Sequence, residues 1–275
     1  MNVEEIIERK IPVLASFSGG KDSCAMALYL LYESGIPKEQ IRLLFADTGW
    51  EHHYTYSTVL RMAMHHPIQI VRSKKYDGMV GLMEKRGIPT QLVRYCTQEL
   101  KVFPLREYQN RYDEYITAKG IRKEEGTYRN GRGEVDEFEL DLGTMMYSWY
   151  PIRNFTLQDV WDIHAKYRFE RNKLYDLGCN RVGCMPCIYA SKSILKLTGE
   201  LLPEHIEEVR KAEQKRNFPF ISPIGKAKFH NKVANNGKPY ADIDAILKWA
   251  NMTTKEVRAY NPEDDQDTCS SGLCE

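Results

Sequence analysis

The chain has no long apolar run and almost no excess of charge of one sign, two features that would narrow its class at once. No apolar stretch approaches the length that crosses a membrane, so no membrane partner is expected. The 275 residues carry a formal net charge of +1, so a nucleic-acid partner would need a local basic patch. Residues 1–5 show no basic region before an apolar core, so we expect no secretory signal and a cytoplasmic location.

Seven cysteines are present, and in a chain without a secretory signal they favour metal or redox chemistry over a disulfide framework. Three fall within the nine residues CNRVGCMPC, where Cys184 and Cys187 have the C-x-x-C spacing that directs two thiolates to one metal. A fourth ligand must come from elsewhere, and Cys96 is the natural candidate. A site of Cys96, Cys179, Cys184 and Cys187 could hold an iron–sulfur cluster or zinc, and the ligand count does not separate them. Reduced, unliganded thiols are the alternative, and Cys24 is expected to serve packing.

The most informative motif is SFSGGKDS, which follows an apolar segment at residues 11–15 and precedes a helical pattern at residues 24–31. A strand, a glycine turn and a helix together present backbone N–H groups to an anion. Gly19 and Gly20 allow close backbone approach, and Lys21 adds a cation. The spacing is not that of a Walker A loop, and a plain Gly-Gly turn between core elements is the alternative. We predict a phosphate-binding loop formed by Ser16, Phe17, Ser18, Gly19, Gly20, Lys21, Asp22 and Ser23, with Lys21, Asp22 and Ser23 as its catalytic residues.

Apolar segments at residues 41–49, 67–71 and 116–122 alternate with helical patterns, which predicts an α/β fold. We expect a doubly wound, mostly parallel sheet with helices on both faces, plus a helical cysteine-containing C-terminal region. Ligands of such sheets bind beyond the carboxyl ends of the strands, where Asp47 and Thr48 also fall. Thr156 is expected to cap a helix, with Asp159 three residues on. The expected divisions are a nucleotide-binding domain at 1–150, a helical cluster-binding region at 151–260, and a mobile acidic tail at 261–275 that holds Cys269 and Cys274.

Together these motifs resemble the phosphoadenosine-phosphosulfate-reductase branch of the PP-loop ATP pyrophosphatases, the adenine nucleotide α-hydrolases, over about residues 13–196. SGGKDS is similar to the family's SGGxDS loop, FADTG to its second adenylate-contacting turn, and CTQELK, GIRKEE and PIRNFTLQDVW to three further segments. GCMPC resembles the family's cluster-binding segment and favours [4Fe–4S] over zinc. The resemblance implies ATP and Mg²⁺, with ATP cleaved between its α and β phosphates. It also implies nucleotide contacts from Asp47, Thr48, Gly120 and Arg122.

Within this branch, the complete loop and the lone Cys96 favour a chain that cleaves ATP over a sulfonucleotide reductase. The closest resemblance is to the ATP pyrophosphatase component of DNA phosphorothioation systems of the Dnd and Ssp kind. That resemblance implies adenylylation and thiolation of a nucleic-acid acceptor, DNA in preference to tRNA, beside a cysteine desulfurase or another sulfur donor. Sulfonucleotide reduction, tRNA thiolation and a non-catalytic nucleotide-sensing subunit stay open, as does a homodimer. Lys101, Arg122 and Arg129 are candidate phosphate contacts, and the histidine pairs at 52–53 and 65–66 are expected at the surface or a rim.

Overall fold

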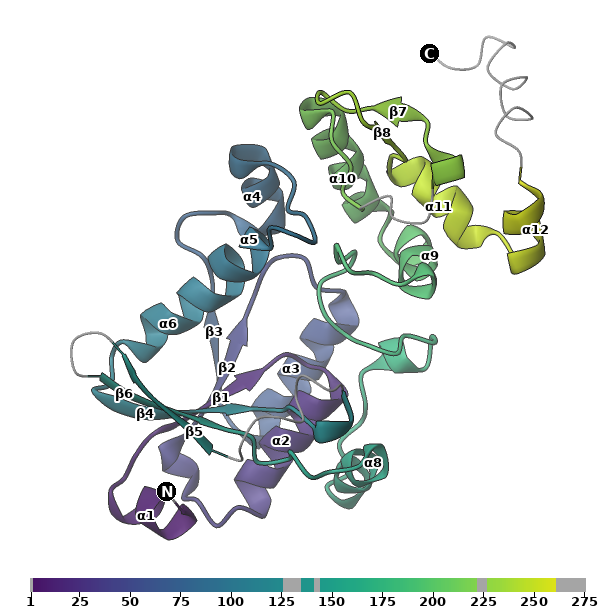
Figure 1. Ribbon diagram of the computed structural model, residues 1–275. Helices are drawn as coiled ribbons and strands as arrows, with labels where there is room; N and C mark the ends of the chain where they lie inside the picture. Colours follow the sequence, from purple (N-terminus) through teal and green to yellow (C-terminus); the bar gives the residue numbers. More distant parts are fainter. Residues whose placement is uncertain (1, 126–134, 141–143, 222–226, 261–275) are drawn as a thin grey trace. The chain divides into compact units, whose positions relative to one another are not determined.

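A six-stranded sheet lies at the centre of the first of two units into which the chain divides (Figure 1). The computed structural model describes residues 2–125, 135–140, 144–221 and 227–260. The first unit comprises Met1–Gly78 and Thr97–Cys184, and the second comprises Met79–Cys96 and Met185–Glu275. The expected tail at 261–275, with Cys269 and Cys274, lies outside the described residues, as does Arg129.

The sheet has the strand order β3-β2-β1-β4-β6-β5. Five strands are parallel, and β5 pairs antiparallel with β6 at one edge. This confirms the expected mostly parallel sheet, while the antiparallel edge strand was not predicted. The strands are β1 Val13–Phe17, β2 Ile41–Ala46, β3 Ile68–Val71, β4 Glu114–Lys119, β5 Val135–Leu140 and β6 Thr144–Trp149.

Helices cover both faces of the sheet because its central strands are apolar on both sides (Figure 1). Val13, Ala15 and Phe17 of β1 point into one core, which α2, α3 and α8 complete. Leu14 of β1 points to the opposite face, where it packs with Tyr108 of α6. The helices of this unit are α1 Val3–Glu8, α2 Lys21–Tyr32, α3 His53–His65, α6 Phe103–Gln109 and α8 Leu157–Lys166, with short turns η1 Lys38–Gln40, η2 Gln98–Val102, η3 Lys123–Glu125 and η5 Lys173–Tyr175.

The division into units differs from the boundary expected near residue 150. Val160 and Ile163 of α8 belong to the same core as α2, so the segment up to residue 184 stays with the sheet. Residues 79–96, placed in the nucleotide-binding domain on sequence grounds, belong instead to the second unit. Both differences arise from packing between segments far apart in the chain, which no local pattern records.

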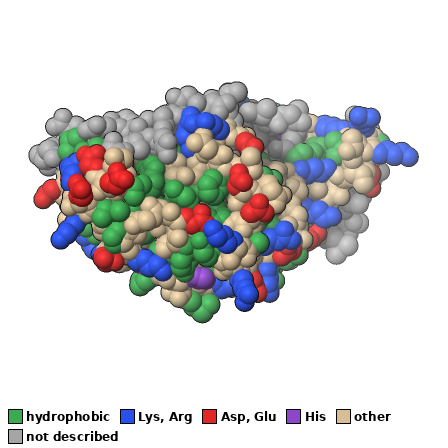
Figure 2. Space-filling model, turned by 90° about the horizontal axis from the view of Figure 1, so that it is seen from below, with side chains coloured by type: hydrophobic (Ala, Val, Ile, Leu, Met, Phe, Trp, Pro, Cys, Tyr) green, Lys and Arg blue, Asp and Glu red, His purple; other side chains and the backbone are tan. Residues whose placement is uncertain are grey.

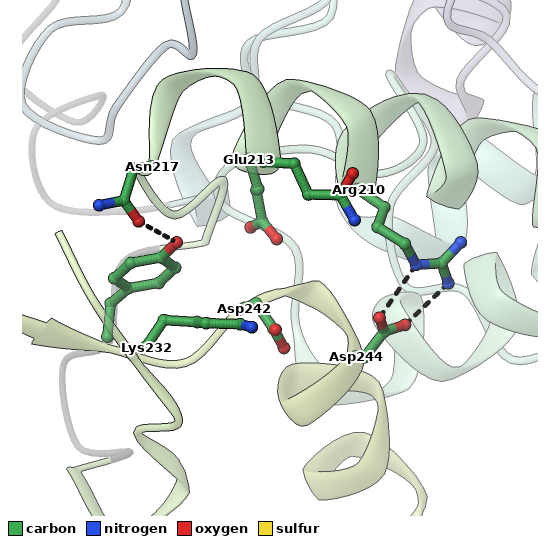
Figure 3. A pocket seen from close by; sticks show the side chains of 8 residues that line it. Arg210, Glu213, Asn217, Lys232, Asp242 and Asp244 are labelled. Atoms are coloured by element: carbon green, nitrogen blue, oxygen red, sulfur yellow. Dashed lines mark hydrogen bonds and ion pairs between the residues drawn. The ribbon is translucent and has the colours of Figure 1, made fainter. Parts of the chain in front are cut away.

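The second unit is mostly helical, as expected for the C-terminal region. Its buried Glu213 accepts backbone N–H groups from Phe220 at 2.8 Å and from Ile243 at 2.7 Å, which ties α10 to the start of α11. Beside it lies a pocket of about 360 Å³, where Arg210 and Asp244 form a two-point ion pair (Figure 3). The elements are α4 Gly78–Arg86, α5 Tyr95–Thr97, α9 Lys192–Leu201, α10 Pro203–Arg216, η6 Ala227–Phe229, β7 Lys232–Val233, β8 Pro239–Tyr240, α11 Ile243–Asn251 and α12 Thr254–Ala259.

The described surface carries no dominant sign of charge on the face that Figure 2 shows, where basic and acidic side chains are interspersed. This agrees with the net charge of +1. Across the described ranges, every helix is too short or too polar to span a bilayer.

Candidate functional site

The predicted phosphate loop connects β1 to α2 and is closed by its own serines. The Ser23 hydroxyl donates to the Gly20 carbonyl at 2.9 Å and accepts the Ser18 backbone N–H at 3.2 Å. Gly19 has φ +72°, a left-handed conformation in which a side chain would be strained. The loop therefore has the backbone turn that the sequence predicts, with Gly20 as the N-cap of α2. A helix N-terminus of this kind favours an anion.

The loop lies at the point where the order of the sheet reverses, between β1 and β4. Ligands of doubly wound sheets bind at this switch point. Gly120 follows β4 so closely that a Cβ atom there would lie 2.8 Å from the Asp22 carbonyl oxygen and 3.1 Å from the Ser23 nitrogen. Only glycine fits this approach, so the structure places Gly120 directly against the loop. Of the remaining predicted loop residues, Ser16 is within β1 and Phe17 is buried in the core.

Charged groups surround the loop in a compact arrangement. Asp22 accepts a hydrogen bond from Lys21 Nζ at 2.9 Å and another from Arg122 Nε at 2.6 Å. Arg122 is only 5% exposed and also donates to Glu124 at 2.7 Å. The structure thus brings Lys21, Asp22 and Arg122 together, with Asp22 holding both cations beside the loop. The role of each toward a nucleotide stays a prediction.

The second predicted contact, the turn after β2, is held by a network of its own. Asp47 accepts hydrogen bonds from the Gly49 N–H at 2.9 Å, the Tyr56 hydroxyl at 2.8 Å and Arg72 Nε at 2.7 Å. Burial acts to raise the pKa of Asp47, but these hydrogen bonds outweigh it and hold that pKa below its ordinary value. Its carboxylate therefore stabilises the turn. Thr48 is completely buried as well.

Buried Glu51 was not singled out from the sequence, yet it organises the same turn. Its carboxylate accepts the Thr48 hydroxyl at 2.7 Å and the Thr48 N–H at 3.1 Å. Lys101, predicted to contact phosphate, has its ammonium 3.8 Å from the Glu51 carboxylate. The Cys184 sulfur lies 3.7 Å from the same carboxylate, and the two backbones form an isolated β-bridge. This turn and the cysteine segment therefore meet at Glu51.

Three further residues hold the phosphate loop from a distance in the chain, and sequence reasoning missed all three. The Tyr175 hydroxyl accepts the Lys21 N–H at 2.9 Å, and Asn172 Nδ2 donates to the Gly19 carbonyl at 3.3 Å. His164 Nε2 lies 2.9 Å from the Lys21 carbonyl, which can only accept, so this nitrogen carries the proton. Burial lowers the pKa of His164, which keeps the ring neutral. No local motif marks these residues, because their partners lie about 150 positions earlier.

The four predicted cluster ligands are divided between the units. Cys179 and Cys184 belong to the first unit, and Cys96 and Cys187 belong to the second. The Tyr189 N–H donates to Cys187 Sγ at 3.5 Å. Four thiols form a donor set that fits an iron–sulfur cluster or zinc by its chemistry. No group of three metal-ligating side chains gathers anywhere within the described residues, so the ligand set stays a prediction. Cys24 is buried in the core as expected.

The chain matches the family model of the phosphoadenosine phosphosulfate reductase domain over residues 12–190. An uncharacterised 37.8 kDa protein of Escherichia phage 186 is 28% identical over 329 aligned residues, covering 95% of this chain and 96% of that protein. Adenosine 5'-phosphosulfate reductase 1 of Bacillus subtilis is 25% identical over 153 residues, covering 54% of this chain and 64% of the reductase. The crystal structure of the phosphoadenylyl-sulfate reductase of Candida auris, a phosphate complex, has a TM-score of 0.50 at 16% identity and covers 67% and 88% of the two chains.

Proposed function

Because this chain belongs to the phosphoadenosine phosphosulfate reductase domain family, we propose that it binds ATP in the loop at residues 18–23 and splits it between the α and β phosphates. The observation that carries the proposal is the complete loop, closed by Ser23 and approached by Gly120 at the switch point of the sheet. An enzyme that takes up a ready-made sulfonucleotide has no pyrophosphate to bind. A complete phosphate loop is therefore the feature expected where a triphosphate is cleaved.

Each residue of the loop has a role that follows from its placement. Backbone N–H groups at the start of α2 and the Lys21 ammonium would neutralise charge on the pyrophosphate leaving group. Arg122, which Asp22 and Glu124 hold beside the loop, would contact phosphate through its guanidinium. Asp22 would hold Mg²⁺ or a water of its coordination shell, and the ion would supply charge neutralisation at the phosphates. His164, Asn172 and Tyr175 position the loop through its backbone.

The proposed acceptor is a nucleic acid, with DNA phosphorothioation as the specific reaction. An acceptor phosphate oxygen would attack the α-phosphorus of ATP, and the bond from that phosphorus to the bridging oxygen would break as pyrophosphate leaves. A persulfide sulfur from a cysteine desulfurase would then displace AMP from the adenylylated acceptor. A thiol would finally reduce the remaining S–S bond by two electrons, leaving one sulfur on the acceptor in place of oxygen.

For the cluster, we propose Cys96, Cys179, Cys184 and Cys187 as ligands, with [4Fe–4S] favoured over zinc. The cluster would supply electron-transfer or sulfur-binding chemistry when bound. We expect anaerobically purified protein to absorb near roughly 400 nm and to contain iron, as thiolate-ligated clusters do. Cys187→Ser should lose iron, while Cys24→Ser, at a core position, should retain it. Zinc in place of iron in the wild type would reject the cluster.

Sulfonucleotide reduction is the second candidate, because the chain is also related to adenosine 5'-phosphosulfate reductases. It predicts release of sulfite and AMP from adenylyl sulfate in the presence of thiols. It also predicts that deletion of residues 269–275, with two cysteines, abolishes the reaction.

The test supplies α-labelled ATP with Mg²⁺, DNA and a persulfide-loaded desulfurase, and follows AMP and pyrophosphate. The wild type should form both products, and Lys21→Ala should lose at least about 100-fold, the typical loss for one oriented charge-stabilising group. Lys196→Ala, an exposed lysine of α9, is the matched control and should behave as wild type. Absence of AMP from the wild type, together with sulfite release from adenylyl sulfate, would replace the proposal by the second candidate.

A further inference from the structure

Residues 168–175 follow the end of α8, and the second half of this segment contacts the phosphate loop. Two contacts fix them there: Asn172 Nδ2 donates to the Gly19 carbonyl at 3.3 Å, and the Tyr175 hydroxyl accepts the Lys21 N–H at 2.9 Å. Phe169 is buried against the rings of His65 and His164. The path of the segment is therefore set by its inward-facing residues.

Four residues of the segment are exposed, and three of them are cationic while the fourth, Glu170, is acidic. Arg168, Arg171 and Lys173 are exposed, whereas Asn172 and Leu174 are 2% and 1% exposed. Arg171 forms a surface ion pair with Asp176. Such a pair contributes little stability, so a phosphate could replace Asp176 at small cost. A local basic patch of this kind is what a near-neutral chain needs in order to bind a polyanion.

Aromatic rings lie beside two of these cations. Lys173 Nζ is 5.7 Å from the centre of the Tyr54 ring, and Arg171 Cζ is 5.8 Å from the centre of the Trp161 ring. Both rings are partly exposed. Cations combined with accessible flat rings are the surface on which single-stranded nucleic acids bind, with phosphates on the cations and bases stacked on the rings.

Arg168 has an unusual backbone for its residue type. Its φ is +51°, directly after the C-cap of α8, where glycine is strongly favoured. Among the described non-glycine residues, positive φ is otherwise found at Lys10 and Asn217. An arginine there costs about 1 kcal/mol relative to glycine. The chain carries this cost at a position where the side chain is exposed to solvent.

We propose that residues 168–175, together with Tyr54 and Trp161, form a docking track for a single-stranded segment of nucleic acid. The inference rests on the proposed function, since the docked strand would be the acceptor that the nucleotide activates. It adds the form of that acceptor, an unpaired strand with accessible bases, and the surface that presents its phosphate to the loop.

The test measures binding of a fluorescent single strand of about 20 nucleotides, by anisotropy and without ATP. The variant combines Arg168→Gly, Arg171→Gln and Lys173→Gln. Since each single-strand phosphate contact contributes about 0.7 to the slope of log K against log salt, the slope should shrink by about 2 and the affinity at physiological salt should fall about 50-fold. Lys10→Gly is the matched control, because it removes one charge at φ +53° outside the track. It should leave binding unchanged.

Arg168→Gly alone separates binding from folding. Glycine suits φ +51°, so the urea midpoint of this variant should equal or exceed that of the wild type while strand affinity falls. Unchanged affinity and salt slope in the triple variant would overturn the track, as would equal binding of a duplex of the same sequence. AMP formation is measured separately with Lys21→Ala. If the triple variant loses strand binding but the wild type forms no AMP, the proposed function is rejected and the docking track stands.

Discussion

Gly120 shows how a single residue can determine whether the loop forms. It lies against the backbone of Asp22 and Ser23, where a methyl group would meet the Asp22 carbonyl carbon at 3.0 Å and its oxygen at 2.8 Å. These atoms belong to backbone that begins α2 and cannot move aside like the end of a side chain. The loop and the end of β4 therefore depend on a residue without a side chain.

We expect Gly120→Ala to destabilise the protein by about 1–3 kcal/mol, the usual cost of overpacking, and to weaken ATP binding. Urea denaturation and isothermal titration measure the two effects. Gly183→Ala is the control, because no atom lies within 4 Å of a Cβ placed there and its φ is not in the left-handed range. Equal behaviour of the two variants would show that the close approach at residue 120 is not needed.

The start of α8 is the element that was predicted most completely from the sequence. The Thr156 hydroxyl accepts the Asp159 N–H at 3.1 Å, and the Asp159 carboxylate accepts the Thr156 N–H at 2.7 Å. This capping box is readable because its two residues are three apart and need no distant partner. Its hydrogen bonds also lower the pKa of Asp159.

Thr156→Ala should lower the free energy of unfolding by about 1 kcal/mol, because the Asp159 N–H loses its acceptor. Thr156→Ser retains a hydroxyl and should cost clearly less. Urea denaturation followed by circular dichroism measures the difference. If both variants lost the same stability, the hydroxyl would not be the stabilising group.

In the second unit, Glu213 makes the stability of α10 and α11 depend on pH. Burial raises the pKa of Glu213 to about 7 from 4.5, with Asp242 and Asp244 adding to the shift. The folded state therefore binds more protons than the unfolded state between these values, so stability falls as pH rises through this range. The Phe220 and Ile243 N–H groups, which donate to the carboxylate, oppose the shift in this pKa. Glu213 lines the pocket of Figure 3 together with Arg210 and Lys232.

We expect the wild type to lose up to roughly 3 kcal/mol relative to Glu213→Gln between about pH 5 and pH 8. Glutamine resembles the protonated acid but does not ionise, so the stability of the variant should lack the pH dependence that Glu213 causes. Histidines titrate in both proteins, so their contribution cancels in the difference between the two free energies of unfolding. Urea midpoints at several pH values give the comparison. A constant difference across this range would show that Glu213 keeps an ordinary pKa.

At the scale of the whole molecule, the central sheet could be predicted from the sequence, but the division of the other segments between the two units could not. Alternating apolar segments and helical patterns are local, and they indicated β1, β2, β3 and β4. Packing of α8 onto α2 joins residues more than a hundred positions apart, so no pattern marked the boundary near residue 184. For the same reason the roles of Asn172 and Tyr175 could not be predicted from the sequence, although the loop that they contact could be. His52 was expected at the surface or a rim. It is completely buried, and its ring accepts the Tyr54 N–H as the N-cap of α3.

These long-range contacts lead to the last prediction, which follows hydrogen exchange with and without ATP and Mg²⁺. Binding at 100 times the dissociation constant stabilises the folded state by about 2.7 kcal/mol. Exchange should slow at residues 18–23 and 119–122, and also at residues 172–175, because Asn172 and Tyr175 contact the loop directly. Residues of α10 and α11 in the second unit should be unaffected. Lys21→Ala should abolish the protection and Lys196→Ala should retain it. Protection confined to the second unit would place the nucleotide elsewhere and contradict the site.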